Sequence, residues 1–193
     1  MNKLILTALA ASALLAPSAA LAQQRGGILI VDTDRVLAEC TACKAAATQM
    51  QAQANTLRTR AQTLQQQLQT EGQPLQTAVT ALAGKQPDAA LKARIDAYEK
   101  KQTAARQELA NGERNLQSIT ANVQQQLGNR LIQIVEQSRA RRGASIAIGK
   151  NNTLANDAAI DITGEVLTAL NQQLPAVSVT PLPQQQQQST QGR

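Results

Sequence analysis

The sequence predicts a mainly α-helical protein with a small β body, an α+β chain in which a long antiparallel helical hairpin projects from a β-rich base. Three observations predict this class. A long apolar seam with heptad spacing stops and then resumes, short apolar runs flank it, and the chain of 193 residues has one aromatic side chain, Tyr98. Globular cores normally use aromatic and branched aliphatic residues, whereas alanine, leucine and glutamine suit long helices.

Residues 1–22 have the features of a secretory signal peptide. Lys3 supplies the positive start, an apolar run covers residues 4–16, and Ala20-Leu21-Ala22 forms a small-x-small site. The apolar run is too short to span a membrane. We therefore expect cleavage after Ala22 and an exported protein in a bacterial periplasm.

The first half of the seam predicts a helix from about residue 41 to residue 83. Its apolar residues recur at alternating spacings of four and three, as in helices that bury a narrow stripe against a partner. They are Met50, Ala54, Leu57, Ala61, Leu64, Leu68, Leu75, Ala78 and Leu82. Inside this helix, Gly72-Gln73-Pro74 predicts a kink or a local opening.

The seam resumes after residues 83–88, a break that lets the chain fold back on itself. The second half consists of Leu91, Ile95, Tyr98, Ala105, Leu109, Leu116, Ile119 and Val123. Pro87 and Asp88 suit a first helical turn and Gly143 suits a helix end, so the return helix is expected over 88–142.

The facing residues of the two helices can be aligned across this turn. With Leu82 set opposite Leu91, Ala61 is expected to face Gly112, where two small residues would let the helices approach closely. The same alignment places residues 28–31, before the hairpin, beside residues 142–145, after it, so both segments lie at the base of the hairpin.

Short apolar segments on either side of the hairpin predict the base itself. Residues 28–31 read as a buried strand and residues 144–148 as a second strand beside it. Asp32 is expected to start a brief helix over 35–39. A further short strand is expected over 153–155.

The final helix is expected to start at Asp161, and the chain after it to be a disordered tail rich in glutamine and proline, residues 175–193. The protein then divides into two parts. Residues 23–43 and 143–174 form the body, and residues 44–142 form the arm.

The body is too small to stand alone. Two or three short strands and one short helix bury little apolar surface, and Ile132 and Val135 add an apolar face where the arm enters the body. Because strand edges and this face need cover, the sequence predicts that several copies associate through the body.

Positive charge is concentrated on the arm. Between Lys44 and Arg142 there are 14 Lys or Arg and 7 Asp or Glu residues, whereas the rest of the chain after residue 22 has 4 and 6. Basic helices attract anionic lipid, acidic polypeptide and phosphate, although a solvated helix face explains the same pattern. The candidate contact residues are Arg58, Arg60, Lys92, Arg94, Lys100, Lys101, Arg106 and Arg114.

No set of residues suited to catalysis is visible. The chain has no histidine, the residue most often used as general acid or base, and no phosphate-binding loop follows a strand. Cys40-Thr41-Ala42-Cys43 is a CxxC motif without the βαβ setting of a redox enzyme, which leaves a structural disulfide between Cys40 and Cys43 or two incidental residues. We therefore expect no enzyme, no metal site and no cofactor.

Several segments resemble the Skp (OmpH) family of periplasmic chaperones. They are the strand that runs into Asp32-Thr33-Asp34-Arg35-Val36-Leu37, the helix start Lys44-Ala45-Ala46, the basic hairpin, and the closing Asp161-Ile162-Thr163-Gly164-Glu165-Val166-Leu167. Two features depart from the family: the cysteine pair and the glutamine-rich tail.

The resemblance implies a homotrimer with a β-rich body and helical tentacles that enclose unfolded outer-membrane proteins without ATP and prevent their aggregation. It also implies contact between the basic tentacles and anionic lipid or lipopolysaccharide. The alternative from the residues is a structural coiled-coil protein that binds cell wall or anionic lipid. A basic nucleic-acid-binding protein is less favoured, and no nucleic acid is expected as partner, because the chain is expected to be exported.

Overall fold

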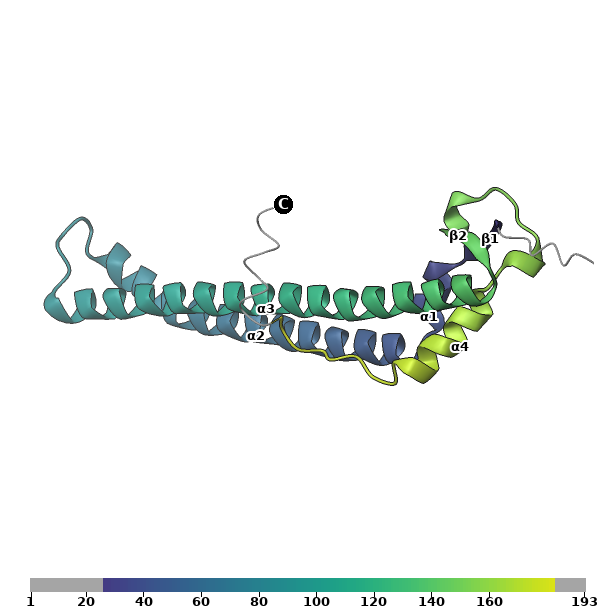
Figure 1. Ribbon diagram of the computed structural model, residues 1–193. Helices are drawn as coiled ribbons and strands as arrows, with labels where there is room; N and C mark the ends of the chain where they lie inside the picture. The colour runs from purple at the N-terminus through teal and green to yellow at the C-terminus, as the bar shows by residue number, and fades with distance from the viewer. Residues whose placement is uncertain (1–25, 183–193) are drawn as a thin grey trace, which may run out of the picture.

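The computed structural model describes residues 26–182, which form a long two-helix arm with a small body at one end (Figure 1). The elements in chain order are β1 (Gly27–Val31), α1 (Thr33–Glu39), α2 (Thr41–Ala81), α3 (Ala89–Arg141), β2 (Ala144–Gly149), the 3-10 turns η1 (Lys150–Asn152) and η2 (Ala158–Ile160), and α4 (Thr163–Gln173). The predicted class, a helical hairpin on a small β body, is confirmed. The predicted signal peptide lies outside the described residues.

Short polar side chains fix where the helices begin. Asp32 Oδ1 accepts a hydrogen bond from the Arg35 amide at 2.9 Å, and Asp88 Oδ1 accepts one from the Leu91 amide at 2.7 Å. Asp161 Oδ1 likewise accepts from the Thr163 amide at 3.0 Å. Each carboxylate satisfies an amide that the helix leaves without a partner.

Left-handed residues end the two long helices. Ala83 and Gly84 have φ values of 47° and 89° after α2, and Gly143 has a φ of 65° after α3. Only glycine takes up this conformation without a steric cost, so Gly143 suits the helix end. α2 is continuous through Pro74 and does not open there.

The body contains a two-stranded sheet in which β1 and β2 run parallel, with Ile28 beside Ile146 and Val31 beside Gly149. The predicted pairing of the two apolar runs is therefore correct. The strand predicted over 153–155 is wrong, because this part of the chain turns through η1 and η2 instead. Asparagine and aspartate favour such turns, and the Asp157 side chain accepts from the Ala159 amide at 2.8 Å.

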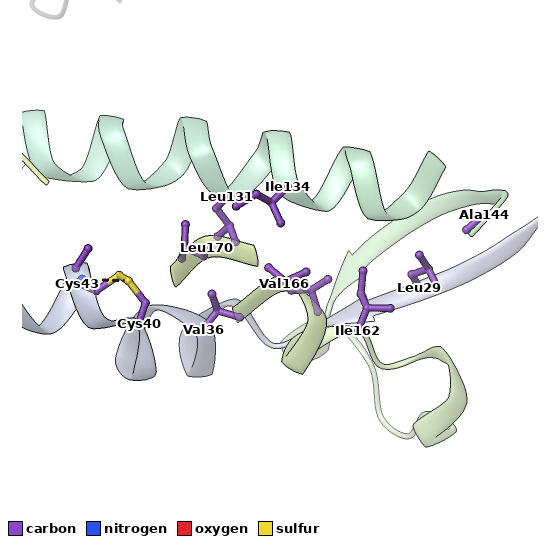
Figure 2. Close-up of a cluster of buried hydrophobic side chains, with 12 residues drawn as sticks. Leu29, Val36, Cys40, Cys43, Leu131, Ile134, Ala144, Ile162, Val166 and Leu170 are labelled. Atoms are coloured by element: carbon purple, nitrogen blue, oxygen red, sulfur yellow. Dashed lines mark hydrogen bonds between the residues drawn. A yellow bond between two sulfur atoms is a disulfide. The ribbon is translucent and has the colours of Figure 1, made fainter. Parts of the chain in front are cut away.

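The apolar core of the body lies between α1, α4 and the last turns of α3 (Figure 2). Its most completely buried members are Val36, Cys40, Ile134, Ile162, Val166 and Leu170. α3 therefore belongs to both parts of the molecule: it forms one side of the arm and then one wall of the body.

The register of the arm differs from the predicted alignment by about one helical turn. Gly112 lies against Leu57, not Ala61: a Cβ on Gly112 would be 2.5 Å from a Leu57 methyl carbon. The alignment was anchored on Leu82, which lies beyond the end of α2. The loop between the helices absorbs the shift.

The sequence predicted a disordered tail from residue 175 onwards, but the first part of this segment is ordered in the structure. Residues 176–182 form a strap that lies along the root of the arm, with Val177 and Val179 packed on the buried residues Ala46 and Val123. The prediction failed because it counted proline and glutamine content and not the two valines. The remaining tail residues, 183–193, lie outside the described residues. None of the helices described here is long and apolar enough to cross a membrane.

Candidate functional site: the surface of the arm

A cleft of about 1000 Å³ opens between α2 and α3 near the tip of the arm. We call it the distal cleft. Its apolar lining includes Leu68, Leu75, Val79, Ile95 and Tyr98, and glutamine side chains surround them. Val79 is 46% exposed. The cleft is thus an open, mixed surface that favours loose contact and not an enclosed pocket for one small ligand.

Tyr98 fixes the spacing of the helices at this cleft. Its hydroxyl donates a hydrogen bond to the Leu68 carbonyl oxygen at 3.0 Å. A Cβ on Gly72 would lie 2.5 Å from the same hydroxyl oxygen. The ring therefore fits because residue 72 has no side chain, and the single aromatic residue links α3 to α2.

Two of the eight predicted cations join the helices. Arg60 binds the Glu108 carboxylate through two hydrogen bonds of 2.6 and 3.0 Å, and Lys101 binds Glu71 at 2.6 and 2.8 Å. The hydrogen bond with Glu108 raises the pKa of Arg60, and the same bond lowers the pKa of Glu108. These two cations pair with carboxylates across the helices, so their charge is largely neutralised.

The other six cations are exposed and, in the described part of the chain, form no ion pair. We call them the free cations: Arg58, Lys92, Arg94, Lys100, Arg106 and Arg114. Arg114 donates a hydrogen bond to its helix neighbour Asn111. Arg94 lines a smaller groove beside Tyr98. Arg94 thus places one free cation next to apolar lining, and the other five are spread along the two arm helices.

A second groove, of about 420 Å³, lies where the arm meets the sheet. We call it the base groove. It is lined by apolar residues of α3 and β2, among them Leu131, Ile132, Ile146 and Ile148. Ile132 is 69% exposed and Ile146 is 47% exposed. Large apolar side chains this exposed at one place are typical of a contact surface between proteins.

The cysteines form a disulfide at the start of α2, with both side chains buried (Figure 2). The sulfur of Cys40 also accepts a hydrogen bond from the Cys43 amide at 3.0 Å, so the pair caps the helix. No cluster of His, Cys, Asp or Glu able to hold a metal occurs between residues 26 and 182.

The comparison with protein families decides where this hairpin belongs. A family model described as "Outer membrane protein (OmpH-like)" matches residues 27–170, which comprise the whole arm and most of the body. The chain belongs to the OmpH-like family. The resemblance seen in the sequence is thereby confirmed, and the family supports a chaperone role.

The same fold occurs in a crystal structure of a candidate outer membrane chaperone (OmpH-like) from Caulobacter crescentus CB15. The TM-score is 0.67 at 15% sequence identity, and the match covers 83% of this chain and 93% of that chain. At this identity the likeness concerns the fold alone. No curated protein matches this OmpH-like chain.

Sequence reasoning missed the residues that hold the strap. Ser118, Asn122 and Gln126 of α3 each form a hydrogen bond with the strap backbone. The signal was present in the OmpH-like sequence as polar side chains at intervals of four residues, which place them on one face of a helix.

Proposed function

We propose that this OmpH-like protein is an ATP-independent holdase chaperone of the periplasm, which binds unfolded outer-membrane proteins and prevents their aggregation on the way to the outer membrane. The observation that carries the proposal is the distal cleft, an open apolar surface near the tip of a long arm whose two helices also carry the free cations. Unfolded outer-membrane chains expose apolar side chains at alternating positions, which suits such a surface.

The binding is proposed to be weak at each point and to use many points. Leu68, Ile95 and Tyr98 are already half-buried and Leu75 is buried, so a client contact removes little further apolar surface from water at each of them. The free cations draw in acidic segments and anionic surfaces such as lipid or lipopolysaccharide from a distance. A client can then leave without an energy source, because no single contact is strong.

A homotrimer is proposed to form through the base groove. Ile28 and Ile146 are neighbours in the sheet and exposed, Ile132 lines the base groove with Ile146, and among residues 26–182 no strand pairs with the outer edge of β2. Such edges and side chains are normally covered. Association through the body would leave the arms free to surround a client.

The holdase role is tested by dilution of a urea-unfolded outer-membrane barrel protein into buffer with and without the mature protein. We expect the chaperone to suppress light scattering. The variant Val79→Ser should suppress it less, because it removes apolar lining from the distal cleft, whereas Ala81→Ser on the same helix should behave as wild type. Scattering that rises equally fast with and without the protein would refute the proposal.

The charge contribution is tested with anionic lipid vesicles. The triple variant Lys92→Gln, Arg94→Gln and Lys100→Gln should bind them more weakly than wild type at low salt, and the difference should shrink as salt screens the charges. Equal binding at low salt would remove the free cations from the proposal.

The trimer is tested by sedimentation at micromolar concentration. Wild type should sediment as a trimer and Ile132→Glu as a smaller species. Leu154→Glu is the matched control, because Leu154 is also exposed but does not line the base groove. A wild-type monomer would contradict this part of the proposal.

A further inference from the structure

The strap is held mainly through its backbone. Gln126 donates to the Ser178 carbonyl oxygen and accepts from the Ser178 amide, both at 3.0 Å. Its primary amide therefore pairs with Ser178 as a neighbouring peptide group would in a sheet. Gln126 is itself positioned by a hydrogen bond of 3.1 Å to the Asn122 side chain.

The contacts repeat along the helix with a fixed step. Gln126 binds residue 178, Asn122 binds the Thr180 carbonyl oxygen at 2.9 Å, and Ser118 accepts from the Leu182 amide at 2.9 Å. Each step is four residues along α3 and two residues along the strap. Four helical residues rise about 6 Å and two extended residues about 6.6 Å, so the two spacings match and the strap runs antiparallel to α3.

The side chains of the strap alternate between the arm and solvent. Val177 and Val179 are half-buried on Ala46, Ile119 and Val123, while Ser178 and Thr180 are exposed. α2 contributes from the other side, because Gln53 donates to the Val179 carbonyl oxygen at 3.3 Å. Figure 1 shows the strap leaving α4 and running beside the arm. The site thus asks for an extended backbone with small apolar side chains at every second position.

We propose that this face of the arm, formed by Gln53, Ser118, Asn122 and Gln126 around the apolar patch, is a binding site for extended polypeptide, which the strap occupies when no client is bound. This rests on the holdase role proposed above. The favoured ligand is a strand-like segment with alternating small apolar and polar residues, the pattern of a membrane β-barrel strand. Since the polar contacts are with backbone groups, many different sequences fit.

The test uses the full chain and a fluorescent peptide with the sequence of residues 175–182. The variant Val177→Ser with Val179→Ser should release the strap and bind this peptide on the order of tenfold more tightly than wild type does. Adding Gln126→Ala to the released variant should weaken binding on the order of tenfold. Gln125→Ala is the matched control, since Gln125 is the same residue type, exposed, and adjacent on α3.

The ligand class is tested by competition for that peptide. An unlabelled peptide of alternating valine and serine should displace it, and a peptide of the same composition with the valines adjacent should do so less well. Equal competition, no competition by the alternating peptide, or no effect of Gln126→Ala would each overturn the proposal.

A second measurement avoids the released variant altogether. When the alternating peptide is added to wild type, hydrogen exchange at the Ser178 and Leu182 amides should accelerate, because these amides lose their partners on α3. Unchanged exchange at saturating peptide would also overturn the proposal. The aggregation assay reports separately on the holdase role. Peptide binding without suppression of aggregation would refute the proposed function, but the proposed polypeptide-binding site would still stand.

Discussion

The body and the arm are built from one chain by different kinds of packing. In the body, Val36, Val166 and Leu170 have no exposed surface, and helices from three directions cover them. Along the distal arm, the buried seam residues Leu64 and Leu75 remain 9% and 8% exposed, and only one helix faces them. On the narrow seam even a buried residue such as Leu75 lines an open cleft.

This difference separates the part of the molecule that is rigidly packed, the body, from the part that leaves apolar surface exposed, the arm. The body can hold one arrangement because its core fixes side chains from several sides. The arm keeps its helices together with a thin seam, one tyrosine and two cross-helix ion pairs, and the surface left over is available to a client.

The largest effect should come from truncation in the body. Leu170→Ala leaves a cavity in a covered core and should lower the free energy of unfolding by about 2–5 kcal/mol. Leu64→Ala on the arm makes the same chemical change next to solvent and should cost less than half as much. Urea unfolding followed by circular dichroism, at one protein concentration, measures both; equal losses would break the comparison.

The disulfide at the junction of the two parts should have the next largest effect. It closes a very short loop, for which the chain-entropy model gives about 2 kcal/mol, and it caps α2. Reductant should lower the free energy of unfolding of wild type by this amount, which is measured as a lower urea midpoint at an unchanged m value. A variant with Cys40→Ala and Cys43→Ala should start at the lower midpoint and not respond to reductant.

Acid should weaken the body through Asp161. Hydrogen bonds from Thr163 and Lys150 lower the pKa of Asp161 to about 2. Because the folded pKa lies below the unfolded value of about 3.9, the stabilisation is present above pH 4 and disappears as the pH falls towards 2. It should amount to about 1–2 kcal/mol at neutral pH.

The comparison that isolates this carboxylate is Asp161→Asn. The variant should be less stable than wild type at pH 7, and the difference between the two should close between about pH 4 and pH 2. A difference that stays constant over this interval would show that the charge of Asp161 is not responsible.

The smallest effect should come from the cross-helix ion pair on the arm. Arg60 and Glu108 are exposed, and exposed pairs contribute little to stability. Arg60→Gln should shift the urea midpoint less than any change above, and the shift should vanish near 1 M salt, where the screening length is about 3 Å. A double-mutant cycle with Glu108→Gln would measure the coupling of the pair.

The sequence was sufficient for the elements of the hairpin because the signals are local. Asp32 starts α1 and Gly143 ends α3 as predicted. Asp88, in contrast, caps α3 just before its first turn, and Ile162 occupies the N-cap position of α4 that the sequence predicted for Asp161. Heptad spacing also predicted that the two helices pair. These features depend on residues near one another in the chain, for which simple propensity and periodicity suffice.

The exact register, the division of the cations and the strap could not be predicted, because each depends on residues far apart in the chain. The register depends on how many residues the loop absorbs, and a slip of one turn preserves the same apolar seam. Arg60 and Arg58 look alike in sequence, yet only Arg60 faces a carboxylate on α3. To predict the strap, one would have to know that Gln126 and Val123 lie on the face of the arm that it covers, and this is known only once the register of the two helices is known.

The parallel pairing of β1 with β2 has a consequence for how this protein can change over evolution. Gly27 and Ala144 are neighbours in the sheet. The chain between them, which includes the whole arm, therefore makes one excursion that leaves the sheet and returns to it at adjacent positions. Adding or removing matched heptads on α2 and α3 would alter how far the excursion extends without disturbing the strands. The reach of the arm could therefore vary on its own, with the root kept constant.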